Sequence, residues 1–483
     1  MVLLIRIIGS IQRLLLILIM PLIIICVVPN PANAAPIVFY DHSYRAFDGD
    51  SGKLYRLTTP PFSDLWNVHN LSLRIMDRYS LSSDTSMVGN RTLIRFADSI
   101  DFGDIDFNFR IRLDAPGGRV RDAGWTSARA GEANDPGFVY DADRIVAYYT
   151  PSERFKFGFG KERYNWGPLE LGGLLLSDYN EGFTGFYQRY KLGPFVLRGL
   201  TTQLNSMVDT VDATRITQRY FSASRLEYYK PAYGAAVGQS IIYAGAGRSL
   251  ELQYFLPFYI FHYGQMTDRR GYGNEGQNTK GSIDGYCKVY KLPLEVYGEL
   301  LIDDFQIHND PLSRSAQNSV AWMAGLRLNG EARPWFGFVE GGQVSTYTYN
   351  HLTLSKRYMM NDCFIGSPLG PDQELLWGRA GRSFLGDTLS VDVNFWLRRS
   401  GERGIGYRID NIFNTKGDPV PYGVVEDELS FWSSVSYRRF YVDMELRGGL
   451  TAYRNRGNAE SGWAAYPFFG VRLTSGISVN AER

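Results

Sequence analysis

The chain has 483 residues and balances 51 Lys and Arg against 50 Asp and Glu, so its formal net charge is +1. A nucleic-acid-binding surface normally shows a basic excess, so this balance argues against a nucleic-acid partner. Aromatic residues make up 14% of the chain and glycines number 51, which fits a β-rich protein better than one of long helices.

Residues 1–34 have the three parts of a secretory signal peptide. Arg6 and Arg13 supply the positive start, 14–28 is a largely apolar run, and a small-x-small cleavage site ends at Ala34. An uncleaved membrane anchor is the alternative, but these fifteen residues are fewer than the roughly twenty of a spanning helix. We therefore expect cleavage after Ala34 and export of the mature chain.

The mature chain shows no pattern of an enzyme, a metal site or a cofactor site. Its five histidines lack the spacing of a His-Glu-x-x-His site, and no Gly-x-Ser-x-Gly sequence occurs. Cys287 and Cys363 are the only cysteines after the leader, too few for a disulfide framework. An oxidising compartment would allow one bridge between them, and the sequence leaves both states open.

Residues 35–88 differ in pattern from the rest of the mature chain. Ser63 precedes apolar residues spaced by three and four positions, which predicts a capped helix: Leu65, Val68, Leu71 and Ile75. We expect 35–88 to form a small helical segment that precedes the first strand. This segment would lie on the periplasmic side or as a plug in a barrel mouth.

From residue 89 to residue 483 the chain consists of successive strand patterns with turn residues between them. In 104–114 every odd position is apolar and every even position is polar, so a strand there has one apolar and one polar face. These eleven residues exceed the common strand length of five or six and match the nine to eleven of a bilayer-crossing strand. A soluble β-sandwich would show the same alternation.

Strand length, strand number and the export signal favour a membrane barrel over the sandwich. At about 20–25 residues per strand and connection, 89–483 would supply about 16–18 strands. Because lipid leaves no partner for an open sheet edge, we expect a closed antiparallel transmembrane β-barrel in the outer membrane of a Gram-negative-type cell. Its partners would be outer-membrane lipid and, during insertion, the barrel assembly machinery.

Several short motifs occur in an order that resembles one family of outer-membrane barrels. A strand ending near Gly160 leads into Trp166-Gly167-Pro168, and the Leu-rich, Ser-containing segment 174–177 follows. Further agreement comes from 254–259 and 297–305. Together these motifs resemble the capsule assembly protein (Wzi) family. The resemblance implies a monomeric barrel that attaches or retains capsular or related polysaccharide at the cell surface.

Candidate ligand-binding residues cluster beside the Trp-Gly-Pro turn. Tyr and Trp offer flat apolar faces for sugar rings together with a hydrogen-bonding group. The residues are Glu162, Arg163, Tyr164 and Trp166, next to the turn residues Gly167 and Pro168. The alternative is that these aromatic residues belong to the aromatic girdle at the membrane interface.

Further motif residues receive a structural interpretation. Pro257 lies in the 254–259 motif, and Asp303 and Asp304 end the 297–305 motif. Adjacent strand residues point to opposite faces, so the two aspartates do not form a carboxylate pair on one face. Glu299 and Asp303 share a face, which favours a lumen-lining or turn role over catalysis.

Two functions remain open from the sequence. The first is the assembly, attachment or retention of surface polysaccharide. The second is a porin-like diffusion channel for small solutes, in which inward-facing charges such as Arg110 and Glu445 would set selectivity.

Overall fold

The fold is known from a computed structural model of the chain, and its description covers most of the sequence after residue 67. The described residues are 68–82, 89–101, 103–118, 139–180, 182–208, 216–267, 277–304, 318–328, 334–351, 353–361, 363–386, 388–404, 415, 417–439 and 442–481. The predicted signal peptide and residues 35–67 lie outside this part of the chain.

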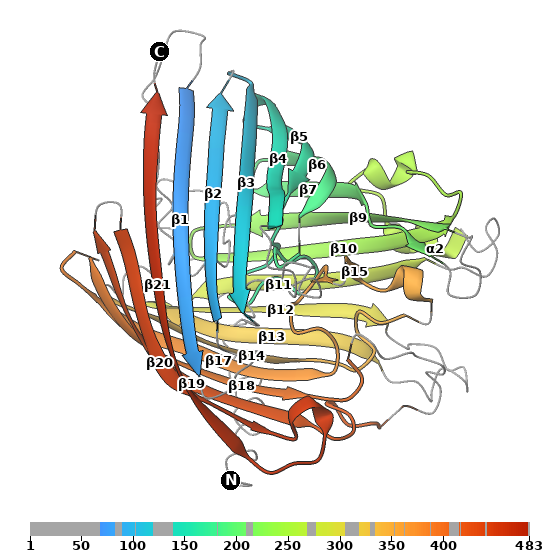
Figure 1. Cartoon of the computed structure of the whole chain (residues 1–483). Helices are drawn as coiled ribbons and strands as arrows, with labels where there is room; N and C mark the ends of the chain where they lie inside the picture. Colours follow the sequence, from blue (N-terminus) through green and yellow to red (C-terminus); the bar gives the residue numbers. More distant parts are fainter. Residues whose placement is uncertain are drawn as a thin grey trace.

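The described residues form one large antiparallel sheet of eighteen long strands (Figure 1). The strands are β1 (Val68–Ser82), β2 (Gly89–Asp101), β3 (Ile105–Gly118), β4 (Val139–Ser152), β5 (Phe155–Glu162), β6 (Phe183–Leu192), β7 (Phe195–Gln203), β9 (Ile216–Tyr229), β10 (Tyr233–Ala246), β11 (Asn278–Lys288), β12 (Leu294–Asp304), β13 (Ser319–Leu328), β14 (Trp335–Val344), β17 (Gln373–Phe384), β18 (Leu389–Ser400), β19 (Glu426–Arg439), β20 (Val442–Arg454) and β21 (Ala464–Ala481). This number agrees with the sequence-based estimate.

Short elements occupy some of the connections. They are β8 (Met207–Val208), η3 (Leu252–Phe255), α2 (Phe261–Thr267), η7 (Leu354–Lys356), β15 (Met359–Met360), β16 (Cys363–Phe364) and η8 (Arg456–Asn458). In the described part of the chain, no helix has both the length and the apolar character needed to span a membrane.

The long strands pair with their neighbours in chain order, and the last strand pairs with the first. β1 pairs with β2 on one side and with β21 on the other, from His69 opposite Ala481 to Ser82 opposite Phe468. Figure 1 shows β21 and β1 running side by side. Each of the eighteen strands therefore has two hydrogen-bonded neighbours.

The prediction of a helix through residues 68–75 is wrong. Residues 68–82 form strand β1, so the sheet begins about twenty residues earlier than the expected boundary at residue 89. The apolar residues Leu71, Leu73 and Ile75 also alternate with polar ones, and this period of two suits a strand. Pairing with β2 and β21 satisfies the backbone hydrogen bonds of the strand along both of its edges.

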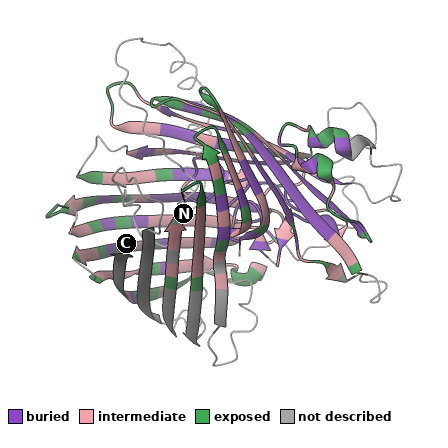
Figure 2. Ribbon diagram, turned by 90° about the horizontal axis from the view of Figure 1, so that it is seen from above, coloured by how far each residue is buried: buried purple, intermediate pink, exposed green. Residues whose placement is uncertain are grey.

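Burial along the strands is the reverse of that in a soluble protein. On β18, Val391 and Val393 are exposed, whereas Asp392 and Asn394 between them are buried. On β11, Ile283 is exposed between buried polar residues. Figure 2 shows this alternation of buried and exposed residues along many strands. The polar side chains therefore face the interior of the sheet and the apolar ones face outward.

The connections differ in length at the two ends of the sheet. Because antiparallel strands alternate in direction, successive connections fall at opposite ends. At one end they are short, for example 153–154 and 193–194; at the other they are long, for example 163–182, 247–277 and 345–372. We call these the short-turn end and the long-connection end.

Candidate functional site

Two long connections run into the interior of the sheet. The first inner segment, 163–182, joins β5 to β6, and its leucines 174–176 are completely buried. The second inner segment, 345–372, joins β14 to β17 and buries Tyr349 and Tyr358. These side chains belong to one apolar cluster with residues from strands around the sheet, including β4, β9, β12 and β17. The two inner segments and the strands that hold them form the candidate site. We call these strands the wall.

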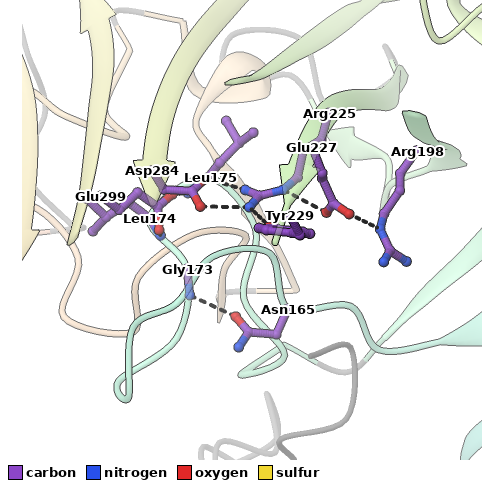
Figure 3. A network of polar contacts seen from close by, with 10 residues as sticks. All are labelled: Asn165, Gly173, Leu174, Leu175, Arg198, Arg225, Glu227, Tyr229, Asp284 and Glu299. Carbon is purple, nitrogen blue, oxygen red and sulfur yellow. Dashed lines mark hydrogen bonds and ion pairs between the residues drawn. The ribbon is translucent and has the colours of Figure 1, made fainter. Parts of the chain in front are cut away.

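A carboxylate of the wall holds the first inner segment through its backbone. Glu299 on β12 accepts hydrogen bonds from the backbone N–H groups of Leu174 at 2.9 Å and Leu175 at 3.0 Å (Figure 3). Gly167 lies against the same carboxylate with φ of +124°, and a Cβ there would be 2.5 Å from Glu299 Oε2. Only glycine suits both this backbone conformation and this close approach.

A second carboxylate, two strands further along the sheet, holds the first inner segment in the same way. Glu340 on β14 accepts hydrogen bonds from the backbone N–H groups of Glu170 at 2.7 Å and Leu171 at 3.1 Å. The Glu170 side chain then pairs with Arg327 of β13 at 2.8 Å. The first inner segment is thus attached to the wall at two separate places.

The second inner segment holds the carbonyl groups of the same residues. Tyr349 donates its hydroxyl hydrogen to the Leu174 carbonyl at 2.6 Å, and Tyr358 donates to the Leu175 carbonyl at 2.7 Å. The two tyrosine rings are stacked, with centroids 5.6 Å apart. Both backbone polar groups of Leu174 and of Leu175 are therefore satisfied in an apolar environment, as buried groups must be.

A buried charge network lines the wall next to this contact (Figure 3). Arg225 of β9 pairs with Asp284 of β11, with one contact at 2.7 Å, and with Glu227 at 2.9 Å. Glu227 also pairs with Arg198 of β7 at 3.0 Å, and Tyr229 accepts from Arg225 at 2.7 Å. Removing one member would leave a buried charge without its partner, which is strongly destabilising.

The second inner segment is attached to the wall by an arginine that binds backbone carbonyls. Arg219 of β9 donates to the carbonyl oxygens of Ser355 at 2.6 Å, Arg357 at 2.9 Å and Met359 at 2.8 Å. This one side chain satisfies three carbonyl groups in a stretch with little regular structure.

A buried histidine lies among cations in the same segment. His351 Nδ1 accepts a hydrogen bond from the Thr353 backbone N–H at 2.9 Å. Burial, together with the positive charges of Lys356 and Lys280, lowers the pKa of His351 from 6.5 to about 4. His351 is therefore neutral at pH 7.

The predicted ligand residues at the end of β5 contact the protein itself. The Glu162 carboxylate pairs with Arg144 at 2.6 Å and accepts a hydrogen bond from the Tyr148 hydroxyl at 3.3 Å. Arg163 is half-buried and its guanidinium donates to the Asp178 carbonyl at 3.5 Å. Ligand binding by Glu162 and Arg163 stays a prediction.

The two predicted aromatic ligand residues are both buried. Tyr164 is 5% exposed and stacks on Tyr187 with ring centroids 5.2 Å apart; Trp166 is 3% exposed and forms a β-bridge with Leu176. The neighbouring Pro168 is buried as well. These rings therefore lie in the interior, away from the outward-facing girdle that was the alternative interpretation.

The remaining predicted motif residues lie at two different places. Asp303 forms an ion pair with Lys280 and accepts a hydrogen bond from the Tyr349 backbone N–H at 2.8 Å, so it faces the second inner segment. Asp304 ends β12, and its side chain lies outside the described part of the structure. Pro257 is buried in the connection after β10.

Sequence reasoning did not single out Glu340, Tyr349 or Tyr358. The hydrogen bond between Glu340 and Leu171 joins residues 169 positions apart, and that between Tyr358 and Leu175 joins residues 183 positions apart. The only local sign of Glu340 in the sequence was a Glu within a largely apolar strand pattern. Cys287 and Cys363 are both buried and no disulfide joins them, so the bridge that the sequence left open is absent.

The described side chains include no group of three or more His, Cys, Asp or Glu placed to hold a metal ion. The prediction that the protein is not an enzyme stays a prediction.

Neither a family model nor a curated protein matches the chain. Among solved structures, it is similar to Wzi of Escherichia coli, described as an outer membrane protein involved in group 1 capsule assembly and a carbohydrate-binding β-barrel. That match has 14% identity, covers 83% of each chain and has a TM-score of 0.54. Pseudomonas aeruginosa OccD3 matches with 11% identity over 85% of this chain and 91% of that one, with a TM-score of 0.50. The chain thus shares the fold of outer-membrane β-barrel proteins of Gram-negative bacteria.

Proposed function

We propose that the chain is a closed, monomeric β-barrel of the outer membrane that takes part in the assembly, attachment or retention of capsular or related surface polysaccharide. The ring of strand pairings supports closure, because β21 pairs with β1. The outward apolar and inward polar side chains support contact with lipid, as in transmembrane barrels. The barrel would bring no metal, cofactor or catalytic group to this role.

The orientation follows from the lengths of the connections. Periplasmic turns of such barrels are short and extracellular connections are longer. We therefore assign the short-turn end, where β21 also ends, to the periplasm and the long-connection end to the cell surface. A surface polysaccharide would meet the protein at the long-connection end.

The observation that favours the polysaccharide role over a channel is the attachment of both inner segments inside the barrel. Glu299, Glu340, Tyr349 and Tyr358 all hold the first inner segment by hydrogen bonds. A diffusion channel needs a continuous water-filled path, and these segments pack against inward side chains of β4, β9, β12 and β17. An anchoring protein needs only a hydrated, stable body.

We place the contact with the polysaccharide on exposed aromatic residues of the long-connection end, because Tyr164 and Trp166 are buried. Trp463 is 37% exposed in the connection before β21, and the Arg454 guanidinium lies 5.7 Å from its ring centroid. An aromatic face beside a cationic hydrogen-bond donor suits a sugar ring that carries hydroxyl or acidic groups.

A binding measurement tests this placement. The Trp463→Ala variant should bind purified surface glycan more weakly than the unaltered protein in a saturable binding assay. Trp335→Ala removes a 54% exposed tryptophan at the short-turn end and serves as the matched control. Equal loss of binding in both variants, or in neither, contradicts a glycan contact at Trp463.

The porin-like channel stays the second candidate, because the inward face of β17 to β21 carries ion pairs. Conductance in planar bilayers separates the two functions. We expect no stable, large, ohmic openings from the purified protein, and a deletion strain that sheds polymer into the medium. Large steady openings, with solute uptake as the only deletion phenotype, would establish the channel instead.

A further inference from the structure

The connection after β10 folds back over the outer face of the barrel. Phe221 of β9 and Ile242 of β10 point inward, since both belong to the cluster around the inner segments. Their chain neighbours must point outward. Those neighbours form a separate cluster with the connection, made of Tyr220, Ile241, Tyr243, Tyr254 and Phe261. We call residues 250–264 the outer segment; its α2 end lies beside β9 and β10 in Figure 1.

The outer segment reaches the middle of the barrel wall. Gln239 is the seventh of the fourteen residues of β10, counted from the short-turn end. Its side chain donates to the Tyr259 carbonyl at 2.6 Å and accepts from the Phe261 backbone N–H at 3.0 Å. One outward amide on the wall thus satisfies both a donor and an acceptor of the segment.

Two further outward polar side chains bind the backbone of the outer segment. Thr201 of β7 donates to the Tyr254 carbonyl at 3.0 Å, and Gln188 of β6 donates to the Phe255 carbonyl. Both side chains are buried, although they lie on the outward face of the strands. They satisfy backbone carbonyls of the segment, and irregular backbone at membrane depth requires such partners.

The free face of the outer segment is mostly apolar, with Gln253 and His262 as its exposed polar residues. Its exposed large apolar side chains are Leu250 at 43%, Leu252 at 81%, Leu256 at 45%, Phe258 at 70%, Ile260 at 64% and Tyr263 at 67%. An apolar surface of this density in a soluble environment would promote aggregation or association. This surface continues the outward apolar face of the neighbouring strands.

That continuity identifies the occupant. Val237 of β10 and Leu226 of β9 are exposed at 52% and 42%, and they are cross-strand partners just beyond the reach of the segment. We propose that the outer segment is embedded in the outer leaflet and contacts lipid acyl chains through Phe258, Ile260 and Leu252. The proposal rests on the proposed membrane barrel and adds a lipid-binding loop that the strands alone do not supply.

Spin labels test the proposal in the full chain reconstituted into phospholipid vesicles. The buried Cys287 and Cys363 are replaced by Ala, and single labels are attached after Phe258→Cys or Ile260→Cys. Val237→Cys gives the reference for the barrel wall, and Glu460→Cys in the exposed connection before β21 gives the aqueous reference. Collisions with oxygen report lipid, whereas collisions with a water-soluble nickel chelate report water.

We expect labels at 258, 260 and 237 to collide with oxygen more than with the nickel chelate, and the label at 460 to show the reverse. Nickel access at 258 and 260 with lipid contact at 237 would overturn the embedded segment and leave the barrel intact. Low access to both reagents at 258 and 260 would show a protein partner there and would also overturn the proposal. Nickel access at 237 would instead overturn the membrane barrel.

Discussion

Individual side chains form hydrogen bonds with single backbone N–H and carbonyl groups of the first inner segment. Leu174 donates its N–H to Glu299 and receives the hydroxyl of Tyr349 at its carbonyl, and Leu175 repeats this with Glu299 and Tyr358. A buried backbone group without a partner costs about 1–3 kcal/mol. The placement of the segment therefore depends on a few side chains with defined chemistry.

The Glu299→Gln variant should loosen the first inner segment. Each carboxylate oxygen accepts one N–H, whereas the amide has a single oxygen and its NH2 group would face the second N–H. We expect a loss of about 1–3 kcal/mol in local stability. Faster hydrogen exchange at the amides of Leu174 and Leu175 would report it.

Glu340→Gln supplies the matched comparison. It removes the same chemistry from Glu170 and Leu171, so exchange should accelerate there first. If both variants accelerate the same amides to the same degree, the two carboxylates do not act as separate attachment points.

The pKa of His351 predicts an acid-sensitive second inner segment. The folded value of about 4 lies below the ordinary value of 6.5, because of burial and then of Lys356 and Lys280. Between these values the unfolded chain binds more protons, so the free energy of unfolding falls as the pH drops from 6.5 to 4 and changes no further through this group below pH 4. NMR titration of the His351 ring should show a midpoint near pH 4. A midpoint near 6.5 would contradict the buried placement.

At the level of elements, the strands were predictable because a half-buried strand shows its two faces in its own sequence. The alternation in 104–114 corresponds to β3, and exposed Ile105 and Ile111 lie on its outer face. The helix predicted around Leu71 and Ile75 was wrong, because spacings of three and four also occur by chance among alternating residues. The pairing of β1 with β21, across the whole chain, decided between the two.

The candidate site was predictable only in part. The sequence singled out 162–168 and Glu299, but it did not show that Glu162, Tyr164 and Trp166 are buried. The sugar-binding role of these residues stays a prediction. The partners of 163–182 come from β12, β14 and 345–372, so no local pattern reveals them. The sequence singled out 254–259 as a motif but did not predict its place on the outer face, since its apolar residues fit a buried core equally well.

Removing the two tyrosine hydroxyls should separate the inner segments without changing the strands. Tyr349→Phe combined with Tyr358→Phe leaves the Leu174 and Leu175 carbonyls without donors, at a cost of about 0.5–1.5 kcal/mol for each lost hydrogen bond. We expect faster exchange across 163–182 and unchanged exchange in β18 and β19. Tyr290→Phe, at a 74% exposed position, should have no effect. If Tyr290→Phe accelerates exchange in 163–182 as much as the double variant does, the two tyrosine hydroxyls do not hold the inner segments together.

For the molecule as a whole, apolar side chains on the outer face and polar side chains on the inner face indicate which environment each face of the sheet suits. Phe431 on β19 is 57% exposed, whereas Ser430 beside it is 6% exposed and bonds Thr451. The same alternation of exposed apolar and buried polar residues recurs on β11 and β18. We expect a sheet with this distribution to be stable where hydrocarbon covers its outer face.

A charge on the outer face should therefore be costly. We expect Phe431→Arg to lower the free energy of unfolding in phospholipid vesicles by about 2–4 kcal/mol, the cost of a cation near the bilayer midplane. Phe431→Leu keeps the surface apolar and should lose much less. Denaturant titration of the vesicle-inserted protein measures both, and an Arg variant as stable as the Leu variant would contradict lipid contact at this position.

The alternation along β19 offers the most direct test of the membrane barrel. A polarity-sensitive fluorophore is attached in turn to cysteines at Ser430, Phe431, Ser434 and Val435, and quenching by lipids with a nitroxide on the acyl chain is measured. The membrane barrel predicts strong quenching at 431 and 435 and weak quenching at 430 and 434. Equal quenching at all four positions, or none at 431 and 435, would contradict it.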